Sequence, residues 1–196
     1  MWRDVDEGLY HALKLRAALV GGGDLQPQGS VAQLSEGEVQ FYTVEYVEHI
    51  YINPSVEPHS YFHLGSKWKQ DPARALVFLP VTLSVNLASK SIARARNTTA
   101  GFWRETARGW LTITNTRIFV NRAGDYRYWE MKNVRLKPDG LYLELTTLGT
   151  IRLVLPPVSQ AWCYVAVRFL AFGDRNPSIK VPRGFAERAA ASGRPI

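Results

Sequence analysis

Hydrophobic and polar residues alternate along several stretches of this chain, with the period of two that is typical of β-strands with one buried face. The most apolar stretch is residues 75–90, ALVFLPVTLSVNLASK, where a hydrophobic residue occupies every second position from Val77 to Leu87. A helix that spans a membrane needs about 20 consecutive apolar residues, whereas Arg74 and Lys90 enclose only 15 residues here. The pattern therefore predicts a half-buried strand and not a membrane span.

Further strands are predicted where the same alternation or a β-branched and aromatic composition recurs, at 39–52, 109–114, 117–121, 126–136, 141–145 and 151–155. Short turns separate the later strands, at Asn115–Thr116, at Pro138 and Gly140, and at Gly149. Strands connected in this way form an antiparallel meander. Residues 89–108 are polar and basic, and we expect a short helix or an ordered loop there.

Helical spacing of hydrophobic residues occurs near both ends of the chain. It extends over residues 4–20, where Gly21 ends the pattern, and over residues 158–170, where Gly173 is placed as a C-terminal stop. Between the first helix and the strands, GGGDLQPQGS has the composition of a flexible linker. The second helix has an apolar face that only the sheet can cover.

These elements predict an α+β, mainly β fold: a bent antiparallel sheet or small barrel of about seven strands, capped by one C-terminal helix, plus an N-terminal helix. The domain covers residues 34–173, with a long loop at 53–76 and a basic insert at 88–108. Residues 1–33 form the N-terminal amphipathic helix and the flexible linker, and residues 174–196 form a flexible basic tail.

Charge is unevenly distributed along the chain. Residues 1–73 carry 5 Lys or Arg and 10 Asp or Glu, whereas residues 74–137 carry 12 and 3. Such a cationic segment suits a polyanionic partner, although strands that place their basic residues in water explain it equally well. The single cysteine, Cys163, cannot form an internal disulfide, and the acidic N-terminus is unlike a secretory signal, so we expect a cytoplasmic protein, peripheral to a membrane if its partner is lipid.

Three stretches and the last helix carry a resemblance to a known family. They are LSEGE at 34–38, GWLTITNTRIFV at 109–120, DGLYLEL at 139–145 and the helix that contains Trp162. With these residues the chain resembles the pleckstrin-homology-like superfamily, and within it the bacterial PH and GRAM-type domains. The resemblance implies a non-catalytic module that docks on anionic lipid head groups or on a protein partner. It supports the fold more than the function, since related folds host many functions.

Two sets of residues are candidates for ligand or anion binding. The first is Lys67–Trp68–Lys69, an aromatic ring between two cations in the long loop, which suits the interface of a bilayer unless Trp68 folds back onto the domain. The second is the basic series of the insert, in which only Glu105 opposes the cations Lys90, Arg94, Arg96, Arg104 and Arg108. A solvated segment without function is the alternative for this series. We expect Arg117 to have a structural role in its hairpin.

Other functions remain as alternatives. For a nucleic acid, the cations of the basic region 88–137 would contact phosphates, and the rings that would stack on bases are Trp103, Trp110, Tyr126, Tyr128 and Trp129. Alternation in strands turns about half of these rings inward. A structural subunit of a larger complex, or a homo-oligomer, is also open. We expect no enzyme, no cofactor and no metal site, because phosphate-loop and nucleophile motifs are absent and His59 and His63 lack an acid that completes a metal motif.

Overall fold

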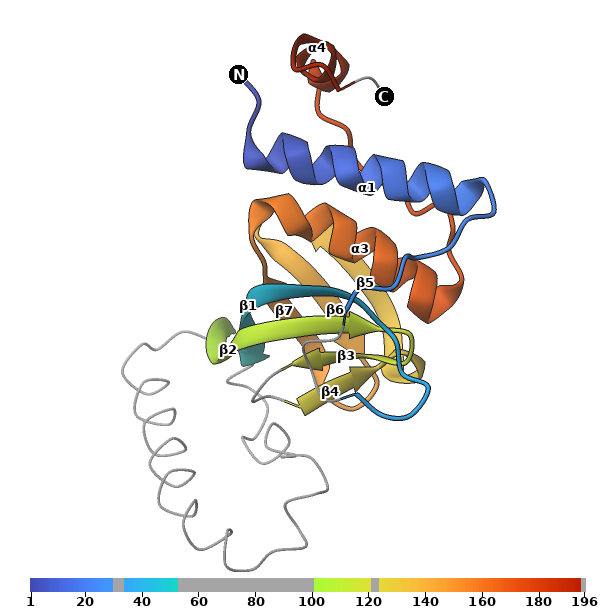
Figure 1. Ribbon diagram of the computed structural model, residues 1–196. Helices are drawn as coiled ribbons and strands as arrows, with labels where there is room; N and C mark the ends of the chain where they lie inside the picture. Colours follow the sequence, from blue (N-terminus) through green and yellow to red (C-terminus); the bar gives the residue numbers. More distant parts are fainter. Residues whose placement is uncertain (30–33, 53–100, 121–123, 195–196) are drawn as a thin grey trace, which may run out of the picture. The chain divides into compact units, whose positions relative to one another are not determined.

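The computed structural model describes residues 1–29, 34–52, 101–120 and 124–194 of the chain (Figure 1). The chain divides into two compact units, the first comprising Met1–His49 with Glu105–Ile196 and the second comprising Ile50–Arg104. Nearly all described residues belong to the first unit. The predicted strand at 77–87, the loop at 53–76 and the insert as far as residue 100 lie outside the described residues.

The described helices and strands follow one another from the N-terminal helix to a short helix near the C-terminus. In chain order they are α1 (Asp4–Val20), β1 (Gln40–Ile52), β2 (Phe102–Thr114), β3 (Arg117–Val120), β4 (Gly124–Arg127), the 3-10 turn η3 (Tyr128–Glu130), β5 (Met131–Lys137), β6 (Gly140–Leu145), β7 (Gly149–Val154), α3 (Pro157–Phe172) and α4 (Phe185–Ala191).

The seven described strands form one antiparallel sheet in the order β4-β3-β2-β1-β7-β6-β5. The sheet therefore consists of two meanders, β1 to β4 and β5 to β7, which join where β1 lies beside β7. Within the second meander, Leu141 pairs with Leu153 and Leu143 with Ile151, and all four side chains are buried. This arrangement confirms the predicted α+β, mainly β class.

The order of the strands requires a strongly curved sheet. Strands β4 and β5 are its two edges, yet only Tyr128–Glu130 connects them. Seven flat strands would place the edges about 29 Å apart, whereas this connection spans at most about 14 Å. The curvature does not close the sheet, because β4 and β5 do not pair in the described part of the chain. Of the two predicted arrangements, the bent sheet is therefore the one formed and the small barrel is wrong.

Two predicted strand boundaries are also wrong. Strand β2 begins at Phe102 rather than at residue 109, so the last part of the predicted helix or loop is extended strand. None of its first nine residues is buried, and hydrophobic alternation is therefore missing there. The predicted strand 126–136 is divided by η3, because the chain passes there from β4 at one edge of the sheet to β5 at the other. Trp129 lies in this connection and is 77% exposed.

The helices form successive layers on the sheet (Figure 1). Helix α3 packs on β5 and β6, α1 packs on α3, and α4 packs on α1. Helix α1 has the predicted bounds, and α3 ends at Gly173, whose φ of 67° is left-handed, as predicted. At Gly8 the two helices approach so closely that a Cβ atom would lie 2.6 Å from the carbonyl oxygen of Val158. Among the described helices, none combines the length and the apolar character that crossing a membrane requires.

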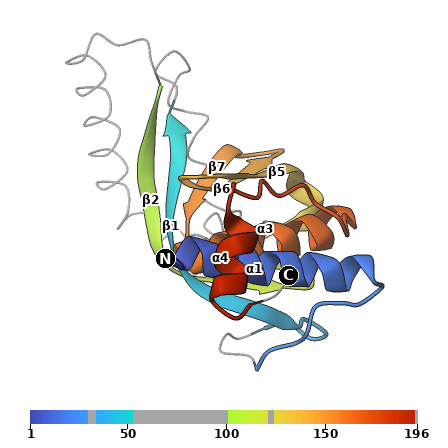
Figure 2. The ribbon, with the colours of Figure 1, turned by 90° about the horizontal axis from the view of Figure 1, so that it is seen from above.

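Helix α4 lies in the segment 174–196, whose composition did not predict a helix. Figure 2 shows it crossing over α1. Its first residue, Phe185, is 1% exposed and packs against Leu9, Tyr10 and Leu13 of α1. The terminal segments of the chain are therefore in contact with each other.

Candidate functional site

The structure describes two of the eight predicted binding residues, Arg104 and Arg108. The other six lie outside the described residues, namely Lys67, Trp68, Lys69, Lys90, Arg94 and Arg96. Arg104 is half-buried in the short described part of the second unit, and Arg108 belongs to the first unit. Of the predicted site, only Arg108 can therefore be placed on the main fold.

Arg108 is exposed and already has an acidic partner. Its side chain is 71% exposed, and its Nε and Nη2 atoms donate to the carboxylate of Glu105 at 2.8 and 3.0 Å. Arg108 and Trp110 are two residues apart on β2, and both are exposed. Trp110 is 52% exposed, which is unusual for a large ring on a central strand.

A pocket opens beside these two side chains. Its volume is about 570 Å³, and three segments line it, Glu45–Val47 of β1, Arg108–Trp110 of β2 and Val154–Pro156 at the end of β7. We call it the β1–β2–β7 pocket. It lies at the seam where the two meanders meet, because β1 has β2 on one side and β7 on the other. The prolyl ring of Pro156 enters the wall because this residue caps the N-terminus of α3.

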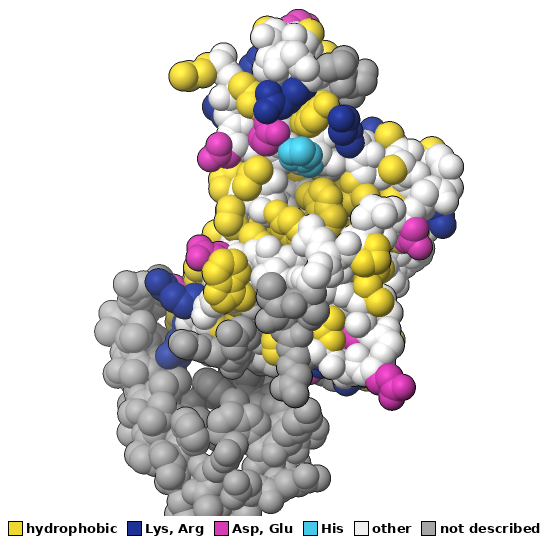
Figure 3. All heavy atoms as spheres, viewed as in Figure 1, with side chains coloured by type: hydrophobic (Ala, Val, Ile, Leu, Met, Phe, Trp, Pro, Cys, Tyr) yellow, Lys and Arg dark blue, Asp and Glu magenta, His cyan; other side chains and the backbone are white. Residues whose placement is uncertain are grey.

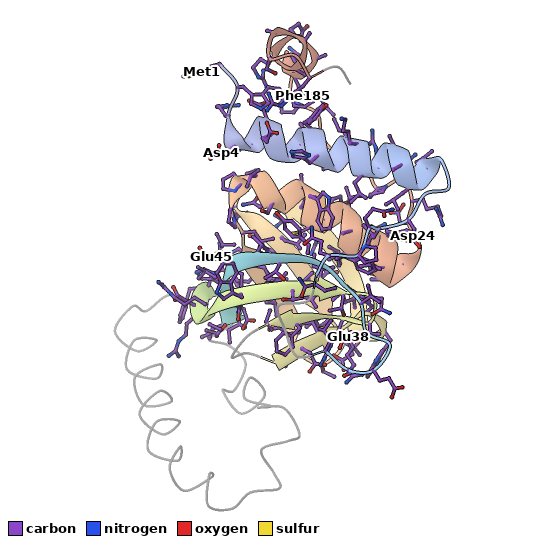
Figure 4. All side chains as sticks on the ribbon, viewed as in Figure 1. Met1, Asp4, Asp24, Glu38, Glu45 and Phe185 are labelled. Atoms are coloured by element: carbon purple, nitrogen blue, oxygen red, sulfur yellow. The ribbon has the colours of Figure 1, made fainter. Side chains whose placement is uncertain are left out.

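The lining of the β1–β2–β7 pocket is mixed in chemistry. Val47, Val154 and Pro156 provide apolar surface, while Glu45 and Arg108 provide the charges. Glu45 lies near the middle of β1 and is exposed (Figure 4), and none of the ion pairs among the described residues involves it. Figure 3 shows an acidic, a hydrophobic and a basic side chain next to one another over β1 and β2. The site therefore offers an aromatic ring, an apolar wall and an unpaired carboxylate.

Arg117 belongs to a buried polar cluster that is structural, as the sequence analysis expected. Its Nε and Nη2 atoms each donate to the Glu38 carboxylate at 2.9 Å, and its Nη1 atom donates to Asp125 at 3.3 Å. Thr114 and Thr116 also donate to Glu38, at 2.7 and 3.0 Å. The hydrogen bonds from Arg117 lower the pKa of Glu38 to about 2. The cluster joins the LSEGE segment to the 115–116 turn.

A second buried carboxylate, Glu48, lies on the inner side of β1. Its side chain accepts a hydrogen bond from Tyr126 and one from Thr106, the latter at 2.6 Å. Burial raises the pKa of Tyr126, so this phenol stays protonated and donates. Donors from the chain itself therefore contact both oxygens of Glu38 and both oxygens of Glu48.

The remaining chemistry-bearing residues are buried or dispersed. Cys163 is fully buried, and burial raises the pKa of its thiol, which leaves it as a core residue. No group of three or more His, Cys, Asp or Glu side chains in the described ranges is arranged to hold a metal ion. His59 and His63 lie outside the described residues. Among the five aromatics considered for base stacking, Tyr126 and Tyr128 are buried, Trp103 is half-buried, and Trp110 and Trp129 are exposed.

Sequence reasoning found Arg108 and missed the rest of the pocket. Trp110 entered only as a candidate for stacking, and Glu45 did not enter at all. One signal was present, because Glu45 is a charged residue at an outward position between the inward Val44 and Tyr46. What the sequence alone could not indicate is that β7, distant in the chain, lies beside β1.

No protein-family model, no curated protein and no solved structure matches this chain. The resemblance to the pleckstrin-homology-like superfamily therefore stays a prediction, and the chemistry of the β1–β2–β7 pocket is the basis on which a function can be proposed.

Proposed function

We propose that this protein is a non-catalytic binding module that takes a segment of a partner protein into the β1–β2–β7 pocket. One observation carries the proposal: a half-exposed tryptophan, Trp110, lines an open pocket between an exposed glutamate and an exposed arginine. Tryptophan and arginine are the residues most enriched among those that dominate protein interfaces. Large rings exposed beside an apolar concavity are also typical of binding surfaces.

The charges at this pocket favour a protein partner over an anionic membrane. Arg108 donates to Glu105, and Glu45 adds a second carboxylate to the rim. An anionic bilayer attracts a surface with a clear excess of Lys and Arg. Among the described residues, the charged side chains that line this pocket are Glu45 and Arg108, and Arg108 is paired with Glu105, so they give no excess of positive charge for acidic head groups to bind.

The same features define the segment that would fit. An apolar side chain would pack against Trp110 and Pro156, and a lysine or arginine beside it would pair with Glu45. The ion pair with Glu45 orients the bound segment and raises its association rate more than its affinity, since exposed ion pairs contribute about 0.2–1 kcal/mol. The contact with the Trp110 ring provides most of the binding energy.

Selection from a random peptide library displayed on phage, with the immobilised full chain as bait, tests the proposal. We expect enrichment of peptides in which an apolar residue lies next to Lys or Arg, and we expect Trp110→Ala to remove their binding. Trp129→Ala is the matched control, since it removes another exposed tryptophan away from the pocket.

Co-sedimentation with vesicles of phosphatidylserine and phosphatidylcholine, compared with vesicles of phosphatidylcholine alone, tests the alternative of a lipid partner. If no peptide is enriched, and if the chain co-sediments with acidic vesicles in a way that Trp110→Ala does not change, then a protein partner in this pocket is the wrong assignment.

A further inference from the structure

The face of α1 that points away from α3 forms a site that α4 occupies. Phe185 of α4 inserts into a cluster formed by Leu9, Tyr10 and Leu13, with Trp2 packed against it. The Phe185 and Trp2 rings lie 5.7 Å apart between centroids. Figure 4 shows Phe185 between the two helices. Phe185 is the largest apolar side chain of this contact, to which Ile179 and the fully buried Ala189 add smaller surfaces.

Charged groups surround the aromatic contact. The Nη2 atom of Arg188 donates to Asp6 at 2.7 Å, and Asp6 is 1% exposed. Arg194 lies 3.1 Å from the Glu7 carboxylate, and its guanidinium is 5.3 Å from the Trp2 ring centroid. Two acids of the first turn of α1 thus receive two arginines of the C-terminal segment. The arrangement of an aromatic anchor within a rim of arginine pairs is typical of binding hot spots.

Helix α4 depends on this site, whereas α1 does not depend on α4. A helix of seven residues is too short to be stable alone in water. Helix α1 packs independently on α3 through the close approach at Gly8. The segment before α4 is tied separately, because Arg175 donates to the carbonyl oxygens of Leu19 and Gly23 at 2.9 and 3.0 Å. Removal of α4 therefore leaves α1 in place with an apolar and acidic face exposed.

We propose that this face of α1 is a binding site for a basic helical segment of a partner protein, and that α4 occupies the site as a displaceable intramolecular ligand. The fitting segment carries one aromatic residue and an arginine three residues later, as Phe185 and Arg188 do. This is the helix-in-groove mode of recognition, with the acids Asp6 and Glu7 selecting for basic partners. The site is separate from the β1–β2–β7 pocket.

A fluorescently labelled peptide of residues 180–194, added to the full chain, tests the proposal by anisotropy. In the wild-type chain α4 competes with the peptide at a high effective concentration. Phe185→Ala in the full chain weakens this competitor. We therefore expect the Phe185→Ala chain to bind the peptide at least roughly tenfold more tightly than the wild-type chain does. The same substitution placed in the peptide should abolish binding. A Val181→Ala peptide is the matched control, because Val181 is 49% exposed and lies outside the cluster.

Circular dichroism establishes that the Phe185→Ala chain is folded. If it is not, the double variant Arg188→Glu and Arg194→Glu is used instead. Its new carboxylates repel Asp6 and Glu7 and so weaken the binding of α4, while every apolar residue of the cluster is unchanged. A folded, opened chain that binds the peptide no better than wild type, or that binds the Phe185→Ala peptide equally well, would overturn the proposal. Concentration-dependent dimerisation of the wild-type chain that Phe185→Ala abolishes would also overturn it, since a second copy would then be the occupant.

Discussion

Glu38 makes folding dependent on pH. Its side chain is 2% exposed, and Arg117 holds its pKa at about 2, below the ordinary value of 4.5. Arg188 likewise lowers the pKa of Asp6, and Tyr142 that of Asp139. A carboxyl with a lowered pKa in the folded state stabilises the fold above its unfolded pKa, and this contribution is lost as the pH falls through the folded value.

We therefore expect the free energy of unfolding to decrease as the pH falls from 4.5 to about 2. The share of Glu38 is about 3 kcal/mol, from the usual 1.36 kcal/mol for each pKa unit. Denaturant titrations at pH 7 and in this acidic range measure it. Constant stability across the range would show that the Glu38 cluster is not formed.

Substitution of Glu38 tests the same cluster at neutral pH. Glu38→Gln leaves the Arg117 guanidinium largely buried with weaker partners, so we expect a loss of about 2–3 kcal/mol of stability. Glu36→Gln is the matched control, because Glu36 is exposed and two residues away. Equal stabilities of the two variants in urea unfolding would contradict the structural role given to Glu38.

At the scale of elements, the close packing of α1 on α3 requires a residue without a side chain, Gly8. Gly8→Ala would place a Cβ atom 2.6 Å from the Val158 carbonyl oxygen and 2.7 Å from that of Pro157. Alanine gains about 1 kcal/mol of helix propensity over glycine, but the contacts are with backbone atoms that cannot rotate away. We expect a net loss of about 1–3 kcal/mol, the usual cost of overpacking.

Thermal and urea unfolding of Gly8→Ala measure this effect. Gly29→Ala is the control, since a Cβ atom there meets nothing within 4 Å. A Gly8→Ala chain as stable as wild type would mean that α1 does not pack on α3 at this distance.

The elements that could be predicted from the sequence are those that bury hydrophobic residues at regular intervals. Strands β6 and β7 bury a hydrophobic residue at every second position, and α1 and α3 bury residues on successive turns, so their periodicity is visible. The first half of β2 buries none of its side chains and gives no periodic signal. Helix α4 is held by a few apolar residues, chiefly Phe185, and by ion pairs with α1, which do not form a periodic pattern in the local sequence.

On the scale of the whole molecule, the candidate site depends on contacts between distant segments. Residues 45, 110 and 156 line one pocket because β1 lies between β2 and β7. Sequence reasoning selected Arg108 from charge alone and counted Glu105 as the one opposing acid of the series, without assigning it to Arg108. Composition therefore indicated a cationic surface, whereas the described pocket has a guanidinium that is neutralised and a carboxylate that is not.

The affinity of a peptide enriched by phage selection, measured by calorimetry for four chains, shows whether the β1–β2–β7 pocket binds a partner. The chains are wild type, Trp110→Ala, Trp129→Ala and Glu45→Lys. We expect Trp110→Ala to weaken binding about 30-fold or more, which corresponds to a hot-spot loss of about 2 kcal/mol. Trp129→Ala should bind as wild type does, and Glu45→Lys should disfavour basic peptides. Undiminished binding by Trp110→Ala, or equal losses in the two tryptophan variants, would contradict a partner site in the β1–β2–β7 pocket.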